Sequence, residues 1–131
     1  MAQGKQMERD AGATAIRIAE RYIALEAFQD ATNTTLLIPD KFEQIRLLLK
    51  IATQLQQSKL PVLKTDSKKV LAAAFKIATS IRPTTKESIT TIIRIAEFQI
   101  GADDQEGARQ SLAHTENVLE KRRFMGRDQL R

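Results

Sequence analysis

The side chains that could carry catalytic or metal chemistry are few in this 131-residue chain. It has no cysteine and a single histidine, His114, which excludes thiolate nucleophiles, disulfides, zinc–thiolate sites and multi-histidine metal clusters. Asp103, Asp104 and Glu106 could form a carboxylate pair, but a turn followed by a helix N-terminus explains the same spacing. We therefore expect no catalytic residue, metal site or cofactor, and we interpret the protein as a non-enzyme.

His114 has a setting that resembles a known reactive site. The segment from Ser111 to Thr115 is similar to the surroundings of the phosphorylated histidine in phosphotransfer domains. Those domains follow the histidine with a lysine and then a glycine that lets the incoming partner approach. Asn117 and Val118 stand in these two places here, so we rank phosphotransfer behind a surface or half-buried helical histidine.

Basic side chains are concentrated in the middle of the chain and at its end. Residues 41–86 contain ten basic and two acidic residues, and residues 121–131 contain five basic and one acidic residue. Five of these cations are candidates for phosphate binding: Lys64, Lys68, Lys69, Arg122 and Arg123. Few aromatic residues accompany them, so bases would find little to stack on, and we expect weak, non-specific nucleic-acid binding at most.

The elements that must position these residues are helices. Apolar residues recur three and four positions apart in three long sets, and strand-type alternation is absent. The sets are Ile45, Leu48, Leu49, Ala52, Leu55; Val70, Ala74, Ile77, Ala78, Ile81; and Ile89, Ile92, Ile93, Ala96, Ile100. With weaker stripes at both ends, the sequence predicts an all-α fold of about six helices, of which the one over residues 28–38 is short or distorted.

Helix boundaries are predicted from caps and prolines. Three capping boxes, Asp40 with Glu43, Thr84 with Glu87 and Asp103 with Glu106, mark helix N-termini. Pro39 and Pro83 precede two of them, and Gly101 is placed as a helix stop. Pro61 and the polar stretch from Lys64 to Lys69 predict a further break, after which Asp66 or Ser67 would cap the next helix.

No apolar run approaches the roughly 20 residues that a membrane helix needs. The first ten residues are charged where a secretory signal would be hydrophobic. We therefore expect a cytoplasmic protein that does not interact with a membrane.

A basic residue, Ile and Ala recur as a triplet within three successive predicted helices. The triplets are Arg17-Ile18-Ala19, Lys50-Ile51-Ala52 and Arg94-Ile95-Ala96, at offsets of 33 and 44 residues. The caps at Asp40 and Thr84 are also 44 residues apart, so caps and triplets shift together. Such spacing is typical of stacked helix pairs.

These residues resemble the tetratricopeptide repeat family. The clearest unit is 92–118, with Ile95-Ala96 in its first helix and Ala108 and Leu112 as the packing residues of its second. The turn of the second unit is longer than the family norm, and Thr35 stands where the first unit would have a large residue. The resemblance implies a right-handed solenoid of antiparallel helix pairs over residues 13–120. A flexible N-terminus (1–12) would precede it, and a basic helix end or tail (121–131) would follow. A plain helical bundle stays open.

The resemblance also implies a protein–protein interaction module that binds a peptide or helix of a partner on the face of its first helices. The residues expected there are Glu20, Ile23, Arg46, Thr53, Gln56, Glu97 and Ile100. The partner is another protein, with self-association open. The alternative function is a basic helical nucleic-acid-binding or regulatory protein.

Overall fold

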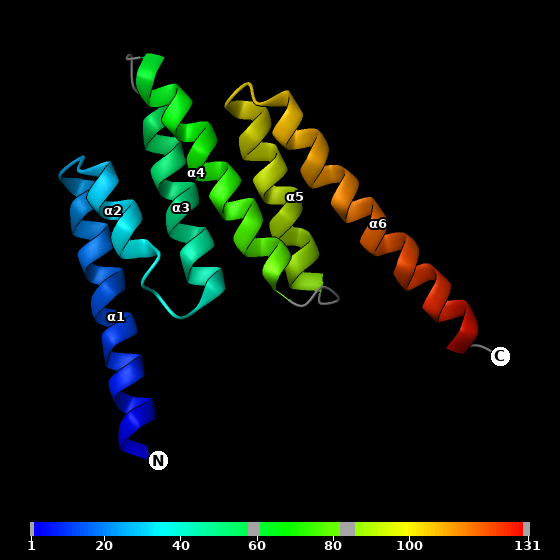
Figure 1. The fold of residues 1–131 in the computed structure, drawn as a ribbon, viewed down its shortest axis with the longest axis horizontal. Helices are drawn as coiled ribbons and strands as arrows, with labels where there is room; N and C mark the ends of the chain where they lie inside the picture. The colour runs from blue at the N-terminus through cyan, green and yellow to red at the C-terminus, as the bar shows by residue number, and fades with distance from the viewer. Residues whose placement is uncertain (1, 58–60, 82–85, 130–131) are drawn as a thin grey trace.

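Six helices form a row in the computed structural model (Figure 1), which describes residues 2–57, 61–81 and 86–129, with side chains at 10–57, 66–81 and 86–121. They are α1 (Ala2–Ala24), α2 (Phe28–Thr35), α3 (Lys41–Gln56), α4 (Pro61–Ser80), α5 (Lys86–Gly101) and α6 (Gln105–Gln129). Consecutive helices pack as antiparallel hairpins, α1–α2, α3–α4 and α5–α6. The all-α prediction is therefore confirmed, including the short helix α2.

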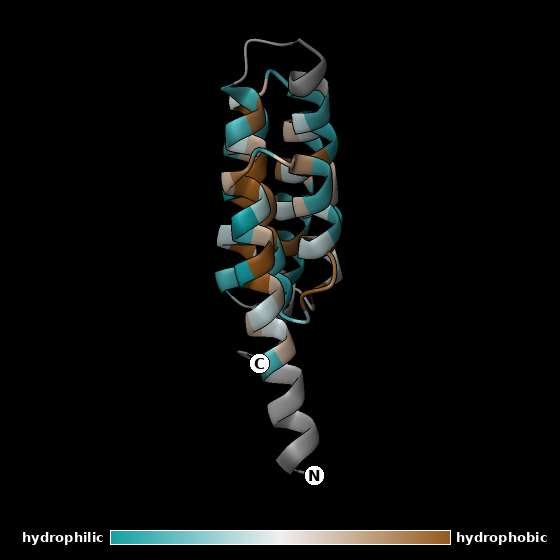
Figure 2. Cartoon of the chain, turned by 90° about the vertical axis from the view of Figure 1, so that its left-hand side faces the viewer, coloured by the Kyte–Doolittle hydropathy of each residue, from teal (hydrophilic) through white to brown (hydrophobic). Residues whose placement is uncertain are grey.

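Each hairpin packs against the next one in chain order. Helix α2 contacts α3 and α4 contacts α5, while the first helices α1, α3 and α5 also contact one another in sequence. The middle helix α3 contributes much of the core, because Leu47, Leu48 and Ile51 are fully buried. Seen from the side of α1, the apolar residues gather between the two columns of helices (Figure 2). No helix in the described part of the chain is both long and apolar enough to cross a membrane.

Small residues lie at the contact within each hairpin. Ala19 and Ala31 are fully buried in the first hairpin, and Ala96 and Ala108 are buried in the third. In the second hairpin the corresponding pair is Ala52 and Ser67, whose Oγ donates to the Ala52 carbonyl oxygen at 3.3 Å. Such small side chains let the two helix backbones approach closely.

The predicted cap at Asp40 is confirmed. Its side chain accepts hydrogen bonds from the backbone N–H groups of Phe42 and Glu43 at 2.9 and 3.3 Å. The predicted cap at Thr84 lies outside the described residues. In α2, the hydroxyls of Thr32, Thr34 and Thr35 donate to the carbonyl four residues earlier. This bonding competes with the helix backbone and is consistent with a short helix.

The predicted break after Pro61 is wrong. Pro61 is the first residue of α4, and the helix continues through residues 64–69 to Ser80. A proline suits this position because the first N–H groups of a helix have no intrahelical acceptor. Neither Asp66 nor Ser67 caps a helix, and Ser67 is buried inside α4.

The turns of the first and third hairpins share one geometry. Glu26 and Asp103 have left-handed backbone angles, with φ of 60° and 59°. The next N–H, of Ala27 or Asp104, donates to the carbonyl five residues earlier, at 2.9 and 2.8 Å, which is a Schellman helix end. Asp103 is therefore the end of a helix rather than a cap, and Asp104 caps α6 by accepting from the Gly107 N–H at 3.1 Å.

Helices α1 and α6 extend past their hairpin partners at the same side of the row (Figure 1). Most of the segment predicted as a flexible N-terminus, residues 1–12, belongs to α1, which begins at Ala2. The basic segment 121–131 is helical as far as Gln129. Leu112, expected to pack inside the third hairpin, is instead exposed on α6.

We expect Gly107→Ala to destabilise the protein by on the order of 1 kcal/mol, although alanine is the better helix former. A Cβ at position 107 would lie 2.8 Å from both Asp104 Cγ and Gln99 Nε2. Both side chains are held in place, because Asp104 caps α6 and Gln99 Oε1 accepts from the Ser111 hydroxyl at 2.6 Å. Urea unfolding of the variant measures the loss.

Gly101→Ala is the matched control, because its nearest neighbour would be Gln56 Oε1 at 3.6 Å, an ordinary contact. This variant should gain a few tenths to about 1 kcal/mol from helix propensity. A gain at both glycines would contradict the packing described around Asp104.

Candidate binding face

The first helices of the three hairpins line two adjoining hollows. The hollow between α1 and α3 has a volume of about 330 Å³ and is lined by Arg17, Glu20, Arg21, Ala24 and Lys50. The hollow between α3 and α5 has a volume of about 210 Å³ and is lined by Arg46, Leu49, Lys50, Thr53, Arg94 and Phe98. Because Lys50 borders both, they form one surface, which we name the first-helix groove.

The first-helix groove is basic. Five of its lining residues are Arg or Lys and one, Glu20, is acidic. Arg46 is held by two carboxylates, Glu43 Oε2 at 2.8 Å and Glu20 Oε1 at 3.3 Å. The hydrogen bond to Glu43 raises the pKa of the Arg46 guanidinium, with a smaller opposing effect of burial. The charge of Arg46 is therefore largely compensated within the chain.

The other four cations of the groove are uncompensated. Within the described residues, Arg17, Arg21, Lys50 and Arg94 form no ion pair. Arg17, Lys50 and Arg94 are also the basic members of the three repeated triplets. Each first helix thus contributes one cation to the groove from the same position of its triplet, and the positive charge follows the row.

The sequence predicted three of the groove-lining residues, Glu20, Arg46 and Thr53. Gln56 lies half-buried beside them and donates from Nε2 to the Phe98 carbonyl oxygen at 3.3 Å, which ties α3 to α5. Glu97 and Ile100 are exposed on α5, Ile100 to 62%, without lining either hollow.

Ile23 was predicted as a partner-binding residue, and this is wrong. Its side chain is 2% exposed and belongs to the core. Ile23 lies four residues after Ala19, so both point to the same side of α1. The predicted face combined polar residues with Ile23 and Ile100, whereas the groove is lined mainly by charged side chains.

Arg17, Arg21, Lys50 and Arg94 are groove residues that the sequence reasoning missed. The triplets themselves carried the signal for three of them. When the Ile and Ala of a triplet are buried, the basic residue before them lies on another side of the helix. Because this basic residue recurs in all three triplets, the first helices share a positively charged face.

The residues predicted to bind phosphate do not form one cluster. Lys68 and Lys69 are exposed on α4, a second helix, and so lie on a different element from the groove. The side chains of Lys64, Arg122 and Arg123 lie outside the described residues.

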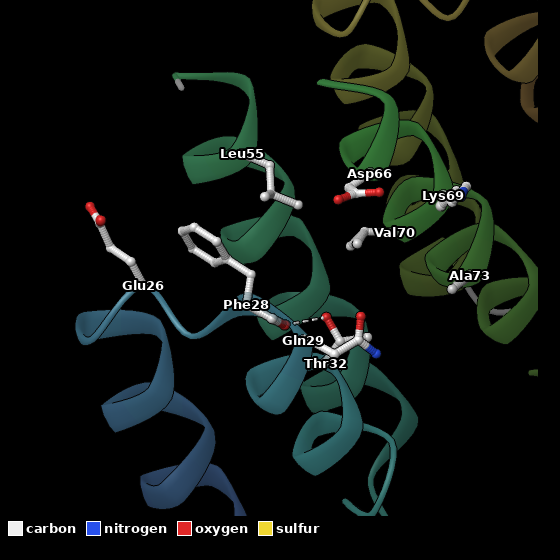
Figure 3. Close-up of a pocket in the computed structure, with 9 residues that line it drawn as sticks. All are labelled: Glu26, Phe28, Gln29, Thr32, Leu55, Asp66, Lys69, Val70 and Ala73. Carbon is white, nitrogen blue, oxygen red and sulfur yellow. Dashed lines mark hydrogen bonds between the residues drawn. The ribbon is translucent and has the colours of Figure 1, made fainter. Parts of the chain in front are cut away.

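A third hollow, of about 420 Å³, opens between α2 and α4 over α3 (Figure 3). Phe28, Leu55 and Val70 give it apolar walls, and the polar lining residues are Glu26, Gln29, Thr32, Asp66 and Lys69. The Thr32 hydroxyl donates to the Phe28 carbonyl oxygen at 2.8 Å beside it. With two carboxylates and one ammonium group, this hollow has no dominant charge.

His114 and the acidic turn are occupied by structural contacts. The His114 ring is half-buried and meets the Phe75 ring edge to face, with centroids 5.9 Å apart. Asp103 and Asp104 form the turn and the cap described above. Among the residues that the structure describes, no three His, Asp or Glu side chains are grouped to hold a metal ion.

No family model, curated protein or solved structure matches this chain.

Proposed function

We propose that the protein is a non-catalytic interaction module of tetratricopeptide-like stacked helix pairs, and that it binds an acidic segment of a partner protein in the first-helix groove. The observation that supports this most directly is the row of Arg17, Lys50 and Arg94. One uncompensated cation from each first helix can meet successive carboxylates of a chain laid across the helices.

The composition of the groove favours carboxylates as ligands. Arginine presents a planar fork of donors that matches a carboxylate, and lysine supplies a mobile point charge. Thr53 and Gln56 add polar groups at the α3–α5 end, although both already bond within the chain, Thr53 to the Leu49 carbonyl oxygen. We propose that affinity comes from the cations, since the one acidic residue of the groove, Glu20, is already paired with Arg46 at 3.3 Å.

The alternative ligand is the phosphate backbone of a nucleic acid, which is also anionic. The one aromatic residue that lines the groove is Phe98, and it is half-buried, so bases would have little to stack on. This favours the peptide, and the test below includes both ligands.

The central test is the charge reversal Lys50→Glu, because Lys50 borders both hollows. A fluorescent peptide of alternating Glu and Gly serves as the probe in anisotropy titrations at low ionic strength. We expect affinity to fall at least about tenfold, or about 1.4 kcal/mol, and Arg94→Glu to act in the same direction. Arg46→Gln should have a smaller effect, because Glu43 and Glu20 already compensate this guanidinium.

Lys68→Glu is the matched control, with the same change of charge on an exposed position of α4. Peptide affinity should be unchanged in this variant, and in the parent protein it should decrease as salt increases. Equal losses from Lys50→Glu and Lys68→Glu would indicate a nonspecific charge effect and refute the groove. Tighter binding of a single-stranded oligonucleotide than of the peptide, lost in Lys50→Glu, would favour the nucleic-acid alternative.

A further inference from the structure

The repeated triplets place an isoleucine at the same position of each first helix, yet its burial differs. Ile51 in α3 and Ile95 in α5 are fully buried, whereas Ile18 in α1 is 44% exposed. The isoleucine of the triplet is therefore buried in the two first helices that follow another hairpin. In α1, the first described helix, the isoleucine at this position is largely exposed.

Ile18 belongs to an exposed stripe of α1 with Ala11 and Thr14, spaced three and four residues apart, and the exposed Leu25 follows directly after the helix. Glu20 lies about 200° around the helix from Ile18 and reaches toward α3, where it meets Arg46. The stripe therefore points away from the row. We name it the α1 end face.

The other end of the row shows the same incompleteness in α6. We compare each residue of α4 with the residue of α6 that lies 41 positions later in the chain. The two helices are buried alike at their main packing positions. Buried in both helices are the pairs Ser67 and Ala108, Val70 and Ser111, and Ala74 and Thr115.

The two helices differ along one stripe. Leu71 and Ala78 of α4 are 0% and 1% exposed, whereas their counterparts in α6, Leu112 and Leu119, are 41% and 51% exposed. Between Leu71 and Ala78, Phe75 contacts His114 of the next hairpin, so this stripe of α4 faces along the row. We name the corresponding stripe of α6, Leu112, Glu116 and Leu119, the α6 end face.

The inner junctions of the row show what covers such faces. Each is made mainly by a second helix and the first helix of the following hairpin, α2 with α3 and α4 with α5, with a smaller contact between the first helices. Among the described residues, no second helix packs on the α1 end face and no first helix packs on the α6 end face. We propose that a second copy of this chain supplies both, so that copies stack head to tail with α6 of one against α1 of the next.

The shapes of the two helices fit this arrangement. They are the longest in the described chain, at 23 and 25 residues, and both extend past their hairpin partners on the same side of the row (Figure 1). An antiparallel pairing like that of α4 and α5 would set these two extensions side by side. The contact joins different faces and leaves one of each free, so it can continue into longer rows.

The experiment is sedimentation velocity from micromolar to near-millimolar protein, where the mean mass of the parent chain should increase with concentration. Ile18→Glu blocks the α1 end face, and Leu119→Glu blocks the α6 end face. Each variant alone should remain monomeric at every concentration. Their equimolar mixture should form a dimer and no larger species, because one face of each variant is still intact.

Ile100→Glu is the control, an exposed isoleucine of α5 that lies on neither end face, and it should associate like the parent chain. Lys50→Glu should also associate normally, which separates this proposal from the groove. A parent chain that stays monomeric throughout would overturn head-to-tail stacking. Loss of association in Ile18→Glu alone, with Leu119→Glu unaffected, would indicate a symmetric α1–α1 contact and would also overturn it. Circular dichroism checks that both variants remain helical.

Discussion

Ile51→Ala and Ile95→Ala should each lower the free energy of unfolding by about 2–5 kcal/mol. Both side chains are fully buried, and each lies where one hairpin meets the next. Removing the branched side chain loses its transfer free energy and leaves a cavity that the surrounding helices fill only in part. Urea unfolding followed by circular dichroism measures the loss.

Ile18→Ala is the internal comparison, because it makes the same change at the same position of the repeat. Its side chain is 44% exposed, so the loss should be less than about 1 kcal/mol. The measurement is made at low micromolar protein, where stacking of copies does not contribute. Similar losses at positions 18, 51 and 95 would show that the repeat register is wrong.

Ala52→Leu and Ala96→Leu should destabilise the protein by about 1–3 kcal/mol each. Both alanines are buried where the two helices of a hairpin pack together, and Ala52 lies against Ser67 of the facing helix. A leucine there must either displace the partner helix or adopt an unfavourable rotamer. Thermal and urea unfolding should both report the loss.

Ala72→Leu controls for the larger apolar side chain, because Ala72 is exposed on α4. Its unfolding free energy should change by less than about 0.5 kcal/mol. Equal tolerance at positions 52, 96 and 72 would mean that the helices are not in close contact at the small residues.

The helices were predictable because their apolar residues follow the helical period. A helix needs this period to bury one side, whichever way the helices are arranged in the fold. The buried stripe of α3, from Ile45 to Leu55, and the cap at Asp40 are local patterns of this kind. The packing residues Ala96 and Ala108 of the third hairpin were also predicted from the sequence, and both are buried.

The errors at Pro61 and Asp103 have local physical causes. Proline breaks a helix interior but suits a first turn, and sequence alone did not distinguish the two uses. In the turn after α5, either Asp103 or Asp104 could cap α6. The Schellman end places a left-handed residue directly after the C-cap of α5. Asp103 takes that place, which leaves the cap of α6 to Asp104.

Of the residues predicted for the partner-binding face, Glu20, Arg46 and Thr53 line the groove, whereas its cations Arg17, Lys50 and Arg94 were not predicted. Ile23 was assigned to the binding face because helical periodicity alone does not say which of two neighbouring stripes meets the next hairpin. Leu112 was assigned to the core for the same reason. Both assignments depend on how hairpins pack against one another, and that arrangement is not encoded in the pattern of a single helix.

The position of the groove has a mechanical consequence. Its two hollows lie between α1 and α3 and between α3 and α5, which are also the seams where one hairpin rests on the next. Any bending of the row must open or close these seams, and with them the spacing of Arg17, Lys50 and Arg94. A ligand bound to all three cations, as proposed above, would hold the seams at one width and so fix the curvature of the row. The proposed stacking of copies would in turn keep the three charges at a more constant spacing.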